Sequence, residues 1–277
     1  MRRLPWRRDR RGGSFMVKGC VLCAIIAASL GMLVRTMPDS MLRFRGVSKS
    51  FGRTKVLRGI DLDLPAGTCM GLVGLNGMGK TTLIKCMLDF CDLDAGTIDV
   101  HGIEHHRPEA RACLAFLPER FMPPYFLTGR EFLSLMLRLF GRQYEEERGR
   151  AIFAALDLQS TALDDPVRAY SKGTTQKLGL AACFLSERDL FVLDEPMSGL
   201  DPKARARTKD LVLKVKSEGR TLLLTSHSLV DIEEVCDCMT VLHEGILAYT
   251  GSPRELRERF GESSLERAYL KCIESHA

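Results

Sequence analysis

Short apolar runs recur along most of the chain, and stretches with helical character separate them. The runs at 69–73, 190–193 and 221–225 have the length and hydrophobicity of strands that are buried on both faces. Helix-compatible segments lie at 82–88 and 202–217. Because strands that alternate with helices form mostly parallel sheets, this pattern predicts an α/β fold whose site lies at the carboxyl ends of the strands.

The region that opens this fold has a different pattern. Leu42, Phe44 and Val47 have the spacing of one strand, and over 60–64 apolar residues alternate with aspartates as in a half-buried second strand. A further short strand is predicted at 97–100. These features predict an antiparallel β-subdomain in front of the parallel core.

Helical patterns dominate from about residue 120 to residue 170. Thr128 and Glu131 have the spacing of a capping box, which begins an amphipathic helix over 132–140. A second amphipathic segment covers 144–158. We therefore expect a helical subdomain, inserted after an apolar strand at 113–117.

The end of the chain carries its own signals. Gly245 and Gly251 bracket a hairpin-like piece, and Ser252 with Glu255 forms a second capping box that predicts a C-terminal helix. The predicted organisation is a leader over 1–40, a folded core domain over 41–251 and a C-terminal helical extension over 252–277.

One glycine-rich stretch fits the phosphate-binding pattern GxxxxGK[ST]. It follows the strand at 69–73 and precedes the helix at 82–88, as a phosphate loop must. A glycine-rich turn without a ligand is the alternative, and the context favours nucleotide binding. The predicted nucleotide-binding residues are Gly74, Leu75, Asn76, Gly77, Met78, Gly79, Lys80, Thr81 and Thr82.

The chemistry of a polyphosphate explains these residue types. Glycines let backbone N–H groups point inward together, and the following helix adds the positive end of its dipole. Lys80 is expected to reach the β- and γ-phosphates, and Thr81 to hold Mg²⁺ through its hydroxyl. Thr82 is placed to add a contact to a phosphate.

Two carboxylates follow the strand at 190–193. Asp194 and Glu195 taken alone are more typical of a solvated turn. Downstream of a phosphate loop they predict a metal site and a catalytic base. Asp194 can orient Mg²⁺ through its water shell, and Glu195 can accept a proton from the water that attacks the γ-phosphate.

The first 40 residues differ from the rest in charge and hydropathy. They carry a net charge of +6, while the remainder carries −1, so no broad basic surface for nucleic acid is predicted. An arginine cluster precedes an apolar stretch over 19–34. A signal peptide or an anchor would place the rest of the chain on the side without ATP. Translation from Met37 or Met41 is therefore the preferred interpretation.

The ten cysteines are scattered, and neither close pair has the partners of a zinc site. Cys20 with Cys23 and Cys236 with Cys238 therefore indicate reduced thiols. The histidines at 105 and 106 lie in a polar stretch and are predicted to be on the surface.

Six ordered segments together resemble the ATP-binding cassette (ABC) ATPases, over nearly all of residues 41–249. They are the aromatic Phe51, the phosphate loop, the Q-loop-like 117–119, the signature-like 170–177, the strand that ends in the two carboxylates, and 198–201 with His227. The resemblance implies a P-loop NTPase fold of the ABC type, with ATP and Mg²⁺ as cofactors.

The resemblance also implies roles for these residues. Phe51 would stack on adenine, with a hydrophobic plug as the alternative, and His227 would sense the γ-phosphate and align Glu195. Two cassettes would face each other, so the signature Ser171, Lys172, Gly173 and Thr174 would contact ATP in the partner. Asp201 would couple the two sites.

Two segments depart from the family pattern. Glu119 stands where most relatives have Gln, so its contact with the metal would be charged, and a simple acid at a helix start is the alternative. The signature reads Tyr-Ser-Lys-Gly-Thr. Similar spellings occur in the export-type branch, which favours export.

The expected function is the ATP-hydrolysing subunit of an exporter, at the cytoplasmic face of the membrane. Its expected partners are a separate multispan permease and a second ATPase subunit, as a homodimer. The permease would dock at Phe121, Met122, Tyr125 and Phe126, unless these residues merely pack the subdomain. The alternatives are a soluble ABC-type ATPase without a transport role and a nucleotide switch, which Glu195 argues against.

Overall fold

The computed structural model describes residues 40–276. The strands are β1 (Ser40–Phe51), β2 (Thr54–Pro65), β3 (Cys69–Val73), β4 (Ala95–Val100), β5 (Ile103–Glu104), β6 (Leu114–Leu117), β7 (Leu190–Leu193), β8 (Thr221–Ser226), β9 (Cys238–His243) and β10 (Ile246–Gly251). The helices are α2 (Lys80–Met87), α3 (Gly129–Leu139), α4 (Glu146–Leu156), α5 (Lys172–Leu185), α6 (Pro202–Ser217), α7 (Leu229–Val235), α8 (Pro253–Phe260) and α9 (Leu265–Glu274), with 3₁₀ turns at 108–113, 160–164 and 167–169.

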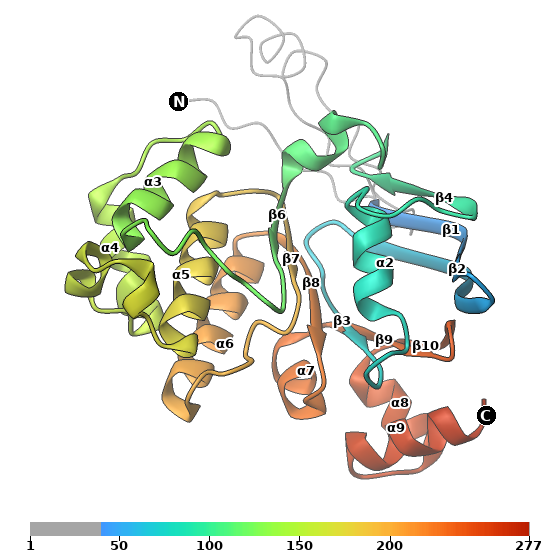
Figure 1. Ribbon diagram of the computed structural model, residues 1–277. Helices are drawn as coiled ribbons and strands as arrows, with labels where there is room; N and C mark the ends of the chain where they lie inside the picture. The colour runs from blue at the N-terminus through green and yellow to red at the C-terminus, as the bar shows by residue number, and fades with distance from the viewer. Residues whose placement is uncertain (1–39, 277) are drawn as a thin grey trace, which may run out of the picture. The chain divides into compact units, whose positions relative to one another are not determined.

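The central sheet has six strands in the order β10-β9-β3-β8-β7-β6 (Figure 1). Every neighbouring pair is parallel except β10 with β9, which form the predicted late hairpin. The carboxyl ends of β3, β6, β7 and β8 therefore open toward one edge of the sheet. This arrangement confirms the predicted α/β fold and its mainly parallel core.

A second sheet contains the predicted antiparallel strands. Its order is β2-β1-β4-β5, and the register of its first pair places Leu42 opposite Leu64 and Phe44 opposite Leu62. These four side chains are almost fully buried. The alternation that predicted the strands is thus the alternation between the core and solvent.

Helix α2 lies between the two sheets, and the remaining major helices cover the other face of the central sheet. Within β7, Leu190 and Val192 belong to the core that includes α2, whereas Phe191 and Leu193 belong to the core on the opposite face. A strand covered on both faces has no polar side, which explains its unbroken apolar sequence.

The helical subdomain is formed by α3 and α4, which pack against α5. The capping box at the start of α3 is present, because Thr128 accepts the N–H of Glu131 and the Glu131 carboxylate accepts the N–H of Thr128. Phe132, Leu133 and Leu137 form the buried face of α3. These contacts connect the subdomain to the helix that carries the signature.

The C-terminal extension contains two helices where one was predicted. Gly261 ends α8 with a φ of +64°, a left-handed conformation that glycine adopts without strain, and α9 follows. No helix among residues 40–276 is long and apolar enough to cross a membrane. The predicted leader and the pair Cys20 and Cys23 lie outside the described residues.

One surface prediction was wrong. His105 is only 8% exposed, and its Nδ1 lies 3.2 Å from the carbonyl oxygen of Ile98. His106 is exposed, as predicted. Cys236 is buried and Cys238 half-buried, and both are free thiols.

Candidate active site

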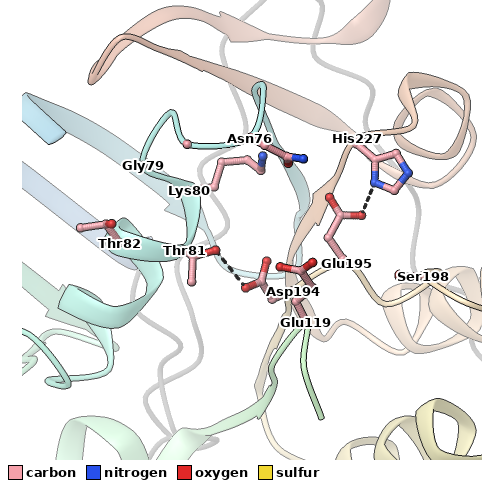
Figure 2. Close-up of a pocket in the computed structure, with 11 residues that line it drawn as sticks. Asn76, Gly79, Lys80, Thr81, Thr82, Glu119, Asp194, Glu195, Ser198 and His227 are labelled. Atoms are coloured by element: carbon pink, nitrogen blue, oxygen red, sulfur yellow. Dashed lines mark hydrogen bonds and ion pairs between the residues drawn. The ribbon is translucent and has the colours of Figure 1, made fainter. Parts of the chain in front are cut away.

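A cavity of about 430 Å³ lies where the carboxyl ends of the parallel strands meet (Figure 2). Four of these strands are followed by residues that line it, as the fold predicts. The lining residues are Asn76, Gly77, Gly79, Lys80, Thr81, Thr82, Glu119, Asp194, Glu195, Ser198 and His227.

The phosphate loop curls tightly between β3 and α2. Gly79 has a φ of +104°, which an L side chain rarely adopts. A Cβ at Gly74 would lie 2.4 Å from the carbonyl oxygen of Leu242, so β9 can approach the loop only at a glycine. Gly74, Leu75 and Met78 belong to the loop but do not line the cavity. Met78 instead accepts the N–H of Glu244 at 3.3 Å.

Lys80 begins α2 and is almost completely buried. Its Nζ donates to the carbonyl oxygen of Gly74 at 2.6 Å and to that of Leu75 at 3.3 Å. Burial lowers the pKa of Lys80, while the carboxylates across the cavity act in the opposite direction. The ammonium is therefore held in a site that favours a bound anion.

Asp194 faces Thr81 and Glu119 at the end of β7 (Figure 2). Its Oδ2 lies 3.4 Å from the Thr81 hydroxyl, and its Oδ1 accepts the Thr225 hydroxyl at 2.6 Å. Burial, followed by the nearby charge of Glu119, raises the pKa of Asp194. A divalent cation between these oxygen ligands would relieve the cost of burying two carboxylates, so the residues fit Mg²⁺.

Glu119 lies in irregular backbone directly after β6. It does not begin a helix, so the alternative of a helix-start acid is wrong. Its carboxylate lines the cavity beside Asp194. No group of three or more His, Cys, Asp or Glu residues in the described part of the chain could hold a metal by itself.

Glu195 points toward His227, which follows β8. Its Oε2 lies 2.8 Å from Nδ1 of His227 (Figure 2). The Glu195 side chain is 11% exposed, whereas that of His227 is 69% exposed. The structure therefore brings together the predicted base and the predicted histidine, at the boundary between the cavity and solvent.

Thr225 is a site residue that the sequence analysis missed. Its hydroxyl accepts the backbone N–H of Glu195 at 2.8 Å and donates to Asp194, so one side chain holds the backbone of Glu195 and the carboxylate of Asp194. Ser198 also lines the cavity and was not assigned to it. The only signal for Thr225 was its position two residues before His227, because the pairing of β7 with β8 is visible only in the fold.

Other predicted residues lie outside this cavity. Phe51 is 54% exposed at the end of β1, with Nζ of Lys49 at 5.3 Å from the centre of its ring. Ser171 caps α5 and accepts the N–H of Thr174 at 3.1 Å. Asp201 caps α6 and accepts a hydrogen bond from the N–H of Ala204. This hydrogen bond is the main cause that lowers the pKa of Asp201.

Comparisons with known proteins find matches in one family. The ABC transporter family profile matches residues 57–198. An uncharacterized ABC transporter ATP-binding protein of Synechocystis is 36% identical over 231 residues, 81% of this chain and 64% of that protein. The chain thus spans less than two thirds of this relative. The Nod factor export ATP-binding protein I of Burkholderia lata is 34% identical over 80% of this chain and 74% of its own.

Solved structures show the same fold. The structure of an ATP-binding subunit of an ABC transporter has a TM-score of 0.77 and 28% identity, and the match covers 84% of this chain and 99% of that one. A dimeric ATP-binding cassette in a post-hydrolysis state, bound to ADP and Pi, has a TM-score of 0.70. It is 18% identical over 76% of this chain and 98% of its own, a likeness of fold alone.

Proposed function

The chain belongs to the ABC transporter family, and from this premise we propose that it binds and hydrolyses ATP to power a transporter. One observation carries the proposal. Lys80, Thr81, Asp194, Glu195 and His227 come from three separate parts of the chain and line one cavity. A structural role alone does not require a buried lysine, two carboxylates and a histidine around one space.

The phosphates of ATP would occupy the loop side of the cavity. Backbone N–H groups around Gly77 and Gly79, the start of α2 and the Lys80 ammonium would bind them. Mg²⁺, held by Thr81 and Asp194 with Glu119 nearby, would neutralise phosphate charge during transfer. These groups together would hold the γ-phosphate opposite Glu195.

Glu195 is the proposed general base. Its carboxylate would accept a proton from the water that attacks the γ-phosphate. His227 would hold that carboxylate through the 2.8 Å contact of Nδ1 with Oε2. Thr225 would fix the backbone of Glu195 from the opposite side, at 2.8 Å. Each contact keeps the base in a single position.

The proposed assembly contains two cassettes and a separate membrane-spanning permease, at the cytoplasmic face of the membrane. The signature at Ser171 lies at the start of α5 and outside the cavity, so it would serve the ATP of a partner subunit. The relative named for Nod factor export supports export as the direction. A soluble ABC-type ATPase without a permease is the second candidate.

The substitution Glu195→Gln tests the catalytic assignment. It removes the base but keeps the size of the side chain, so we expect ATP hydrolysis to fall by about 10²- to 10⁴-fold, while ATP binding is retained. ATP should then hold the variant as a dimer, which size-exclusion chromatography with light scattering detects. The exposed acid Glu218 supplies the control Glu218→Gln, which should hydrolyse ATP at the normal rate.

Hydrolysis at the wild-type rate by Glu195→Gln would disprove the role of this residue. Purification of the tagged full chain from native membranes separates the two candidates. Recovery with a multispan protein supports the transporter subunit. Recovery with other soluble proteins and without a membrane chain supports the second candidate.

A further inference from the structure

Residues 195–201, which we call the catalytic segment, connect β7 to α6. Glu195 begins the segment with a φ of +52°, a left-handed conformation that is strained for a residue other than glycine. Its carbonyl oxygen accepts the N–H of Ser198 at 3.0 Å. Asp201 ends the segment as the cap of α6. A strained segment of this kind keeps its conformation only where the surrounding structure holds it.

Two side chains hold the start of the catalytic segment from different elements. Thr225 of β8 accepts the N–H of Glu195. From α5, Nε2 of Gln176 donates to the carbonyl oxygen of Pro196 at 3.3 Å. Gln176 is only 4% exposed. Because water does not reach this position readily, the loss of the amide would leave a buried carbonyl without its donor.

The first turn of α5 also lies against the later part of the catalytic segment. A Cβ at Gly173 would lie 3.2 Å from the carbonyl oxygen of Gly199, so these two backbones are close. The alkyl chain of Lys172 covers Gly199, since a Cβ placed on Gly199 would lie 3.0 Å from Cδ and Cε of Lys172. The turn that begins at Ser171 is therefore packed along the segment that begins at Glu195.

We infer that Gln176 is a positioning residue that ties the catalytic base to the signature helix. The inference rests on the proposed function, in which Ser171 serves the ATP of the partner and Glu195 serves the ATP of its own subunit. One hydrogen bond then joins elements that act on two different nucleotides. Engagement of Ser171 at one site holds Glu195 in place at the other, and hydrolysis depends on both.

The substitution Gln176→Met tests this inference in the full-length protein. Methionine has a similar length but no donor, so the carbonyl of Pro196 loses its partner. We expect kcat to fall by about 5- to 50-fold, the range expected when a catalytic group is displaced slightly. The Hill coefficient for ATP should fall toward 1. The affinity for ATP should stay within about twofold, because Gln176 does not line the cavity.

A second variant, Gln176→Glu, gives a readout that a purely structural role would not change. A buried carboxyl keeps its proton to higher pH than an exposed one, and the protonated form can donate to Pro196. The kcat of Gln176→Glu relative to that of Gln176→Met should therefore rise as the pH is lowered from 8 to 6. Gln143→Met, at an exposed glutamine between α3 and α4, is the matched control.

A kcat within twofold of the wild type together with an unchanged Hill coefficient in Gln176→Met overturns the inference. An equal loss of ATP affinity and kcat overturns it as well, because this would indicate general damage to the site. If Gln176→Met does not fold, the kcat of Gln176→Glu is compared with that of the wild type. A ratio of these two values that does not change between pH 8 and pH 6 overturns the inference. A wild type without ATPase activity overturns the proposed function and the inference with it.

Discussion

Asp194 shows how a single residue can serve a site at the expense of stability. It is 3% exposed, and burial raises its pKa. The folded state therefore binds a proton at Asp194 more tightly than the unfolded state does. The protonated carboxyl stabilises the protein at a pH below the pKa that Asp194 has in the unfolded chain. This contribution is lost as the pH rises through the higher pKa that Asp194 has in the folded protein. At neutral pH the ionised carboxylate destabilises the protein without nucleotide.

The substitution Asp194→Asn should consequently stabilise the nucleotide-free protein. The amide can still accept the Thr225 hydroxyl and can donate toward Thr81. We expect the melting temperature at pH 7 to rise by about 2–4 °C, which corresponds to about 1 kcal/mol in a domain of this size. The gain should disappear near pH 4, and hydrolysis with Mg²⁺ should fall at least about tenfold. Differential scanning calorimetry at both pH values measures the first effect.

Asp63 provides a control of opposite sign. Although burial acts to raise its pKa, hydrogen bonds from Arg45 and Arg43 hold it below the usual value. Asp63→Asn should lower stability at pH 7 and leave hydrolysis unchanged. A rise in melting temperature in both variants, or in neither, would contradict the conclusion that the buried charge of Asp194 destabilises the protein.

At the level of elements, the phosphate loop is supported from outside by α9. Tyr269 lies on this helix, is 6% exposed, and its hydroxyl lies close to the backbone of Leu75 in the loop. Figure 1 shows the C-terminal helices beside the turn that joins β3 to α2. The C-terminal extension therefore contributes to the shape of the nucleotide site, although none of its side chains lines the cavity.

The substitution Tyr269→Phe removes only the hydroxyl at this contact. We expect the Kd for ATP to rise by about three- to tenfold, the equivalent of one hydrogen bond of about 1 kcal/mol, with kcat unchanged. Isothermal titration calorimetry and steady-state kinetics measure the two quantities. Tyr249→Phe loses a bond to the carbonyl oxygen of Ser252, 2.8 Å away, and should lower stability but not affinity. Equal affinities in all three proteins would show that α9 does not support the loop.

For the whole molecule, the exposed apolar side chains after β6 favour an interface. Met122, Tyr125 and Phe126 are 84%, 68% and 69% exposed, which is costly for large apolar groups unless a partner covers them. Phe121 is different, because it is half-buried and packs at 5.6 Å against the ring of Phe132. Of the four predicted docking residues, Phe121 thus packs the subdomain, and the other three are available to a permease.

Replacement of both Met122 and Phe126 by alanine should weaken assembly with the permease by at least about tenfold and leave the ATPase rate of the isolated protein unchanged. Co-purification from membranes and an ATPase assay measure the two effects. Leu139→Ala, at the 71% exposed end of α3, is the control. Normal assembly of the double variant would count against docking at this surface.

The sequence by itself determined the order of the elements and the local chemistry of the site. The alternation of apolar and polar residues predicted β1 and β2, and unbroken apolar runs predicted β3, β7 and β8. The spacing of the glycines located the phosphate loop with Lys80 and Thr81. These features depend on residues close together in the chain, whose periodicity and backbone freedom can be read directly.

Only the tertiary structure decided which distant residues act together. Thr225 holds the Asp194 carboxylate and the backbone of Glu195 because β7 pairs with β8, and Gln176 reaches Pro196 because α5 packs on the catalytic segment. His105 is buried although its neighbours in the sequence are polar, and α9 reaches Leu75, which lies far from it in the sequence. Such contacts join residues far apart in sequence, and strand order and helix packing bring them within hydrogen-bonding distance without leaving a local pattern.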